Sequence, residues 1–402
     1  MPALFYSLIF VVSMRKLLTA PVKMSLSTAE NHLYQKALEF VSELSLNLMA
    51  VKVEHQPEDF LSWCKQLHQI CQQDLNLELL DEVQFKPLKK LEDTLVLGVS
   101  CSQIRMMRLI PWALFVEYLN ENAAIQSLDE RLNLLSYIKT LQNKPLSEMI
   151  EEDLLAFSGK HTAKHEPALF PFDVEWFSST KSSKAFQQLL TQAPQSLDEA
   201  LESIPLEGEV TTVHYSLFVN AYKNAFTTHL PEEKAPLCPA TRLLAMRRPD
   251  IFVALNNNKL DPLSQGLGLS KLNNQSFTDY WQELIATIHS THWYKSEQPS
   301  DEKELVLWQN RAILTDLFLF ADKAQAEKSN YIRLRDKPKK ANASATKAIK
   351  RSKASAEQLV DQALAADDIP EFLLKMRDSI IKSVQGGKSV EQAISLMRSI
   401  FG

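Results

Sequence analysis

Residues 239–256 read PATRLLAMRRPDIFVALN and carry the pattern on which the fold assignment depends. Ala240–Met246 is an apolar run of good helix formers, and Ile251–Leu255 is a second apolar run after a short loop. The chain then reaches Leu267-Gly268-Leu269, where glycine suits the end of a helix. The stretch therefore predicts a buried helix, a core run and a further helix.

Glycine is scarce elsewhere in the chain. There are eight glycines in 402 residues, about 2% against ~7% in ordinary proteins. A Walker loop needs two glycines at fixed spacing and a dinucleotide fingerprint needs three, and neither Gly266/Gly268 nor Gly386-Gly387 sits in such a motif. Abundant Leu, Ala, Gln and Glu favour helix. We therefore expect a mainly α, multi-domain helical protein that lacks these nucleotide-binding loops.

Helical periodicity and shifts in composition divide the chain into segments. Ser27-Thr28-Ala29-Glu30 has the form of a capping box and begins an amphipathic run. After His161 the prolines and aromatic residues are dense, which is typical of a connection pinned onto a core. The expected segments are an apolar N-terminal extension (1–26), a helical domain (27–160), an aromatic- and proline-containing connection (161–206), a helical central domain (207–330), a basic flexible linker (331–356) and a C-terminal helical module (357–402).

Positive charge is concentrated in Arg333–Lys353, which we call the basic ribbon. It has nine Lys or Arg and one Asp, so its net charge is 9 − 1 = +8, and the remaining residues sum to −5 − 8 = −13. The lysines and arginines of this ribbon could neutralise DNA phosphates. The alternative interpretation is that the ribbon is a solvated spacer between two folded segments. The predicted DNA-binding residues are Lys337, Lys339, Lys340, Lys347, Lys350, Arg351 and Lys353 of the ribbon, with Arg242, Arg247 and Arg248.

The N-terminus is apolar over Ala3–Met14, about half of the ~20 residues that span a bilayer. Cations follow this run, whereas a signal peptide places them ahead of it. We interpret this run as an over-extended start of the sequence, in which case no membrane association is expected. The alternative is that residues 1–23 are present in the protein and form a short membrane anchor. Four cysteines in so long a chain indicate a reduced, cytoplasmic setting.

Cys64, His68 and Cys71 fall at i, i+4 and i+7 of one expected helix. Zinc accepts these ligand types, but structural zinc takes four ligands. Phe60 and Leu67 share the stripe, so we interpret the cysteines as core residues. The sequence indicates no metal and no cofactor.

The stretch quoted first resembles the centre of the helix-hairpin-helix DNA glycosylases. In that family an apolar helix is followed by a loop ending in an apolar run, a catalytic aspartate and a helix closing at Leu-Gly-Leu. With Leu244 at the end of the family's helix, the catalytic aspartate falls at Asn256 and the catalytic lysine at Cys238. The resemblance implies a glycosylase-like helical central domain.

A second resemblance adds Tyr280-Trp281 and Trp308–Asp316 to the same stretch. With these residues the chain is similar to uncharacterised bacterial proteins found beside ATPases and nucleases in defence or mobile-element loci. The two resemblances together cover residues 207–316, a little over a quarter of the chain.

The departures from the glycosylase pattern decide what the resemblance implies. The family's hairpin uses glycines so that backbone N–H groups reach a DNA phosphate, whereas Ala235–Pro239 has no glycine and two prolines without N–H donors. Asn256 is not a carboxylate and Cys238 is not an amine. The resemblance thus implies the scaffold without its chemistry.

Three functions follow from these patterns. The first is a non-catalytic DNA-associated subunit of a bacterial complex in defence against foreign DNA, with a protein partner such as an ATPase or nuclease subunit. The second is a divergent glycosylase or lyase acting on a flipped base, with Asp250 or Asp261 as carboxylate and Lys259 as amine. The third is a protein-interaction scaffold. The predicted partner-binding residues of the C-terminal module are Phe372, Leu373, Met376, Ile380 and Val384.

Overall fold

The computed structural model describes residues 16–18, 24–44, 52–53, 57–322, 329–336, 356–364, 373, 376–385 and 390–401. The fold is mainly α, as the composition predicted, and the paired strands described are β1 (Lys16–Leu17) and β2 (Lys52–Val53), which run antiparallel. The chain forms two compact units, residues 1–337 and 338–402. No helix of the described ranges is long and apolar enough to cross a membrane.

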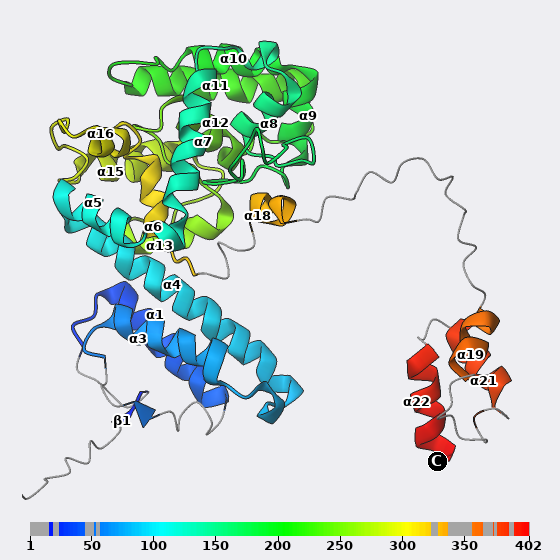
Figure 1. Ribbon diagram of the computed structural model, residues 1–402. Coiled ribbons are helices and arrows are strands. Elements are labelled where there is room, and N and C mark those ends of the chain that lie inside the picture. Colours follow the sequence, from blue (N-terminus) through cyan, green and yellow to red (C-terminus); the bar gives the residue numbers. More distant parts are fainter. Residues whose placement is uncertain are drawn as a thin grey trace, which may run out of the picture. The chain divides into compact units, whose positions relative to one another are not determined.

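Figure 1 shows the order of the helices along the chain. Labels with α denote α-helices, and labels with η denote 3-10 helices, except η1 and η5, which are π-helices. The first unit contains α1 (Thr28–Glu43), α3 (Phe60–Gln69), η1 (Ile70–Asp74), η2 (Leu77–Leu79), η3 (Glu82–Gln84), α4 (Phe85–Leu109), α5 (Trp112–Glu121), α6 (Ala123–Gln126), α7 (Leu128–Leu141), η4 (Leu146–Glu148), α8 (Glu151–Ser158), α9 (Lys184–Gln192), α10 (Pro194–Glu202), α11 (Thr212–His229), α12 (Leu237–Arg247), α13 (Asn257–Leu267), α14 (Phe277–Asp279), η5 (Tyr280–Ile285), α15 (Ala286–Ser290), α16 (Glu302–Gln309), η6 (Ile313–Phe318) and α18 (Asn330–Arg335). The second unit contains α19 (Ala356–Leu364), α21 (Arg377–Gln385) and α22 (Val390–Phe401).

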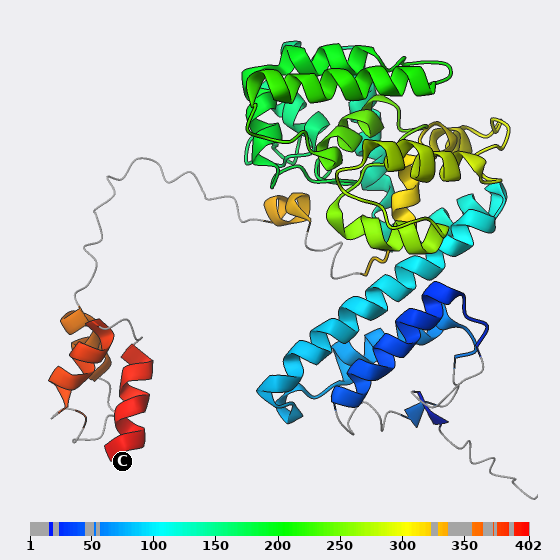
Figure 2. The same cartoon turned by 180° about the vertical axis from the view of Figure 1, so that it is seen from behind.

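Helix α4 connects the two hydrophobic cores of the first unit. Its 25 residues make a rod of about 37 Å. Its N-terminal part packs with α1 and α3, as both views show (Figures 1 and 2). Its C-terminal part belongs to the core that contains α13 and η6. The core on α1 and α3 extends along α4 to Cys101, and the second core begins at Ile104. One helix therefore joins both cores into one unit.

The capping box predicted at Ser27 is confirmed. The Ser27 hydroxyl accepts from the Glu30 N–H at 3.3 Å, and the Glu30 carboxylate accepts from the Ser27 N–H at 2.9 Å. Glu30 is buried and also accepts from Ser102 and Arg105 of α4. The cap thus fixes both the start of α1 and its contact with α4.

The second core runs from Ile104 to Phe318 and includes the aromatic segment. Phe170, Phe172 and Phe177 are all buried in it, which confirms that these aromatics pin the connection to the core. The core continues across the expected boundaries at residues 160 and 206. Those boundaries therefore do not coincide with a division of the hydrophobic core.

Helices α13 and α4 approach closely at Gly266. A Cβ added there would lie 2.7 Å from the Ile104 Cβ and 2.9 Å from the Cys101 carbonyl oxygen. Both groups belong to α4, which also packs with α1 and α3. Glycine is thus required here by the contact between two helices.

The C-terminal unit has a small core of its own, which corrects one assignment made from the sequence. Leu373 and Ile380, predicted to bind a partner, are fully buried against Val360 and Ala393. Val384 packs at the edge of this core and Met376 is half-buried. The apolar face is therefore covered by helices of the same unit. Phe372 lies outside the described residues.

Substituting Gly266→Ala tests the packing of α13 on α4. The clash should cost about 1–3 kcal/mol and outweigh the gain in helix propensity of about 1 kcal/mol, so the thermal midpoint falls. All six tryptophans lie in residues 1–337, so tryptophan fluorescence follows this unit alone. Asp261→Ala, at an exposed position of the same helix, is the control and should leave the midpoint almost unchanged. Equal midpoints for the two variants would contradict this packing.

Candidate functional site

Arg242, predicted to bind DNA, is completely buried. Its guanidinium donates to the carbonyl oxygens of Phe157 (3.1 Å), Ala156 (3.0 Å) and Val174 (3.0 Å), and also to that of Trp176. Burial lowers the pKa of Arg242 to about 9, although nearby acids oppose the shift. A phosphate cannot reach this guanidinium, so the sequence-based assignment of Arg242 is wrong.

The partners of Arg242 explain why it is buried. Ala156 and Phe157 lie in the last turn of α8, where helix carbonyls have no partner within the helix and the dipole favours a cation. Gly159 follows in the left-handed conformation (φ +82°), and a Cβ there would lie 3.2 Å from the Arg242 Nε. Arg242 therefore caps α8 and ties it to α12.

Arg247 and Arg248 also bond to the protein. Arg248 is buried and makes two 2.8 Å bonds to the Asp250 carboxylate, with further bonds to the Pro205 and Gly208 carbonyls. Arg247 is half-buried, and it donates to the carbonyls of Ile204 and Gln142. The assignment of Arg248 to a phosphate is thus also wrong, and Arg247 has two backbone partners of its own.

Lys259, the candidate amine, is held in a buried ion pair. Its ammonium contacts the Asp316 carboxylate and donates to the carbonyl oxygens of Phe177 and, at 3.1 Å, Ala254. Asp316 also accepts from Arg131 at 2.6 Å. Burial lowers the pKa of Lys259, and the Asp316 carboxylate opposes this shift. The lysine therefore anchors α13 to η6 within the core.

The candidate carboxylates do not converge on Lys259. Asp250 is paired with Arg248, as described above. Asp261 is exposed, and at two residues from Lys259 on α13 it points to a different side of the helix. The structure thus does not assemble Asp250, Lys259 and Asp261 into one site.

The other residues singled out from the sequence have structural partners as well. Asn256 caps α13 by accepting from the Asn258 N–H at 3.0 Å, and Cys238 is half-buried near the start of α12. Cys64 and Cys71 are buried in the α1/α3 core, and burial raises the pKa of both thiols. Within the described residues, no three His, Cys, Asp or Glu side chains gather as a metal would require.

The basic ribbon begins on the first unit at α18. Arg333 and Arg335 are exposed on this helix, and the N–H of Asn330 donates to the Asp173 carboxylate at 2.7 Å. Burial alone would raise the pKa of Asp173. Hydrogen bonds from the His161 side chain and from the backbone N–H groups of Glu175 and Asn330 lower this pKa below its usual value. The helix that carries the first residues of the ribbon is thus hydrogen-bonded to the first unit. The predicted contacts Lys337, Lys339, Lys340, Lys347, Lys350, Arg351 and Lys353 lie outside the described residues.

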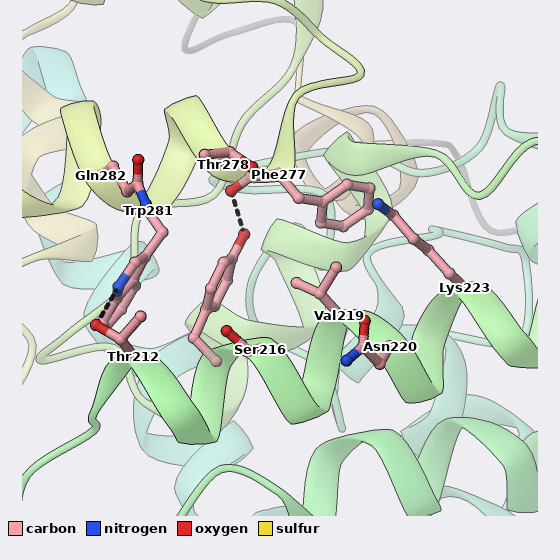
Figure 3. Close-up of a pocket in the computed structure, with 10 residues that line it drawn as sticks. Thr212, Ser216, Val219, Asn220, Lys223, Phe277, Thr278, Trp281 and Gln282 are labelled. Carbon is pink, nitrogen blue, oxygen red and sulfur yellow. Dashed lines mark hydrogen bonds between the residues drawn. The ribbon is translucent and has the colours of Figure 1, made fainter.

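A pocket of about 250 Å³ opens between α11 and the helical segment α14–η5 (Figure 3). We call it the α11–η5 pocket, and local sequence pattern could not predict it, because its walls lie more than fifty residues apart in the chain. Its lining residues are Thr212, Tyr215, Ser216, Val219, Asn220 and Lys223 of α11, with Phe277, Thr278, Trp281 and Gln282.

Tyr215 joins the two walls of this pocket. Its hydroxyl donates to the Phe277 carbonyl at 2.8 Å, and its ring stacks on Trp281 at 4.8 Å between centroids. The Trp281 indole N–H donates to the Thr212 hydroxyl at 3.1 Å, and the Lys223 ammonium lies 4.9 Å from the Phe277 ring centre. The pocket therefore has a rigid aromatic lining with a cation at one end.

Comparisons with protein-family models, curated proteins and solved structures gave no match.

Replacing Arg242 should destabilise the fold before it affects any binding. Arg242→Met removes the guanidinium from four carbonyls, of which, in the described part of the chain, only that of Ala156 keeps another donor, the Gly159 N–H at 3.3 Å, and we expect this to cost about 3 kcal/mol. The tryptophan-detected thermal midpoint should fall by several degrees, and Arg242→Lys should restore only part of it because an ammonium cannot reach all four carbonyls.

Arg333→Met is the matched control, because Arg333 is exposed on α18. It should unfold at the temperature of the unaltered protein. An Arg242→Met protein with an unchanged midpoint and weaker DNA binding would instead restore the original assignment of Arg242 to phosphate.

Proposed function

We propose that this protein is a non-catalytic, DNA-associated adaptor subunit. In this proposal the basic ribbon contacts DNA phosphates, and the helical units on either side of it hold the protein within a larger complex. The observation that carries the proposal is the separation of charge: +8 over Arg333–Lys353 against −13 over the rest of the chain. Such a ribbon binds phosphate without regard to sequence.

The position of the ribbon supports this role. It leaves α18 on the first unit, where Asn330 is bonded to Asp173, and continues into the second unit, which has its own core. Two folded units joined by a cationic segment suit a protein that holds DNA and other proteins together. An ATPase or nuclease subunit is the class of partner we propose, in a bacterial complex that acts against foreign DNA.

The contacts of the body favour an adaptor over an enzyme. Arg248 and Lys259 are paired with Asp250 and Asp316, and the three residues of the glycosylase alternative are not assembled. Their burial and pairing stabilise the fold. The divergent glycosylase or lyase therefore has no specific observation in its favour.

Neutralising the ribbon tests the proposal. Lys337, Lys339, Lys340, Lys347, Lys350, Arg351 and Lys353 are replaced together by Gln in the full chain. Duplex DNA is titrated at about 0.05 M and about 0.2 M salt, since each neutralised phosphate contributes ~0.9 to the slope of log K against log salt. We expect the variant to lose at least about tenfold in affinity at the lower salt, with a clearly shallower slope.

The control removes the same number of charges from exposed lysines of the first unit. These are Lys36, Lys65, Lys86, Lys89, Lys181, Lys184 and Lys234. If this control loses as much affinity as the ribbon variant, net charge alone governs binding and the ribbon has no special role. If the unaltered protein shows no salt-dependent binding of DNA, the scaffold alternative replaces the proposal.

A further inference from the structure

We infer that the α11–η5 pocket is a binding site for a nucleotide unit, with the ring at the Trp281 end and the phosphate at Lys223. The unit could come from a free mononucleotide or from an unpaired position of a DNA strand. The second source rests on the proposed function, and the first does not. The two ends are visible in Figure 3, where Trp281 and Lys223 lie at opposite sides of the pocket.

The aromatic lining favours a planar ligand. Tyr215, Phe277 and Trp281 all line the pocket, and Trp281 is only half-buried. Aromatic side chains bind nucleobases by stacking, which adds about 1–3 kcal/mol per base. The hydrogen bonds of Tyr215 and Trp281 hold their rings in place before a ligand arrives. A flat ring would therefore enter a site that is already ordered.

The polar lining favours a ring with hydrogen-bonding edges. Ser216, Asn220, Thr278 and Gln282 are exposed at the pocket, and each has an uncharged donor and acceptor. Amide side chains match the donor and acceptor pairs of base edges. A purely apolar ring would cover these groups without offering partners, which costs free energy.

The charge of the lining favours an anion. Lys223 is its single cation, and its ten residues include no Asp or Glu. This is notable in a chain whose charge outside the ribbon is −13. An ammonium acts as a compact point charge for phosphate. Thr212 and Lys223 are eleven residues apart on α11, which is about 16 Å along the helix axis. The lining residues of α11 thus extend over about three turns of the helix.

The backbone of one wall provides an independent observation. Phe277–Ser290 is a continuous helix in which Tyr280–Ile285 adopts π-helical hydrogen bonding, and this segment supplies Trp281 and Gln282. π-helical segments are rare and are frequent at functional sites, since they displace side chains from their regular helical positions. Of the two π-helical segments in the described residues, η1 and η5, it is η5 that lines this pocket.

Filling the pocket tests the inference. In Asn220→Trp a bulky side chain at an exposed, pocket-lining position should block the site. Asn224→Trp is the matched control, because Asn224 is exposed on the same helix outside the lining. Calorimetric titration of the full chain uses two probes, 2′-deoxyadenosine 5′-monophosphate and a short single-stranded oligodeoxythymidine. We expect Asn220→Trp to weaken binding at least about tenfold and the control to match the unaltered protein.

A second variant tests the phosphate end. Lys223→Gln should weaken binding by about fivefold and reduce its salt dependence, whereas Lys181→Gln, at an exposed lysine outside the pocket, should not. Binding of the mononucleotide supports a free nucleotide as ligand, and binding of the oligomer alone supports a strand. Absence of binding for both probes, or equal effects of Asn220→Trp and Asn224→Trp, would overturn the inference.

The same titrations on the chain with the neutralised ribbon separate this inference from the proposed function. Pocket variants should leave duplex affinity unchanged, and ribbon variants should leave mononucleotide affinity unchanged. If the unaltered protein does not bind duplex DNA but does bind the mononucleotide, the adaptor proposal fails and the pocket inference stands.

Discussion

The buried guanidinium of Arg242 is the constraint on which the arrangement of the first unit depends. It donates to four carbonyl oxygens that come from the end of α8 and from Val174 and Trp176 in the connection. Placing a cation there removes it from water, and only a dense set of acceptors offsets that cost. One side chain therefore links α8 and the connection to α12, within the hydrophobic core that all three share. Gly159 completes the arrangement, since a larger residue would collide with the guanidinium and with the Ser178 carbonyl.

The surrounding charges balance this cation. Asp173, Glu175 and Asp316 raise the pKa of Arg242 against the effect of burial. Asp316 itself lies between Arg131 and Lys259, which ties α7, α13 and η6 together. Asp173 accepts from Asn330 and so holds the start of α18. The network that stabilises the core thus also fixes the point from which the basic ribbon departs.

The sequence predicted what depends on local pattern and missed what depends on distant contacts. The capping box at Ser27 and the buried aromatics of the connection follow from short-range spacing and composition, and both are confirmed. Arg242 was misassigned because an arginine is usually exposed. Yet a signal was present: the residues on both sides of Arg242 in α12 are mostly apolar, and they are buried around the whole helix, so a cation in its middle is buried with them.

Two other features could not be predicted from local sequence pattern. The amphipathic face with Leu373 and Ile380 indicates that something covers it, but whether that is another chain or the same chain depends on the tertiary fold. The α11–η5 pocket joins residues around 212–223 and 277–282, and no local pattern links them.

The charge distribution explains how the ribbon and the pocket would act together on DNA. The residues outside the ribbon, of net charge −13 in total, repel phosphate at distances within about a Debye length, ~10 Å at 0.1 M salt. In the proposed function, DNA held by the ribbon would be repelled by most of the protein surface, whereas the pocket presents Lys223 without a carboxylate in its lining. Because the ribbon and the pocket belong to one chain, a strand long enough to reach both would have a raised effective concentration at the second site once the first is bound. Two individually weak sites would then bind one strand with combined affinity, and repulsion elsewhere would direct the strand to these two places.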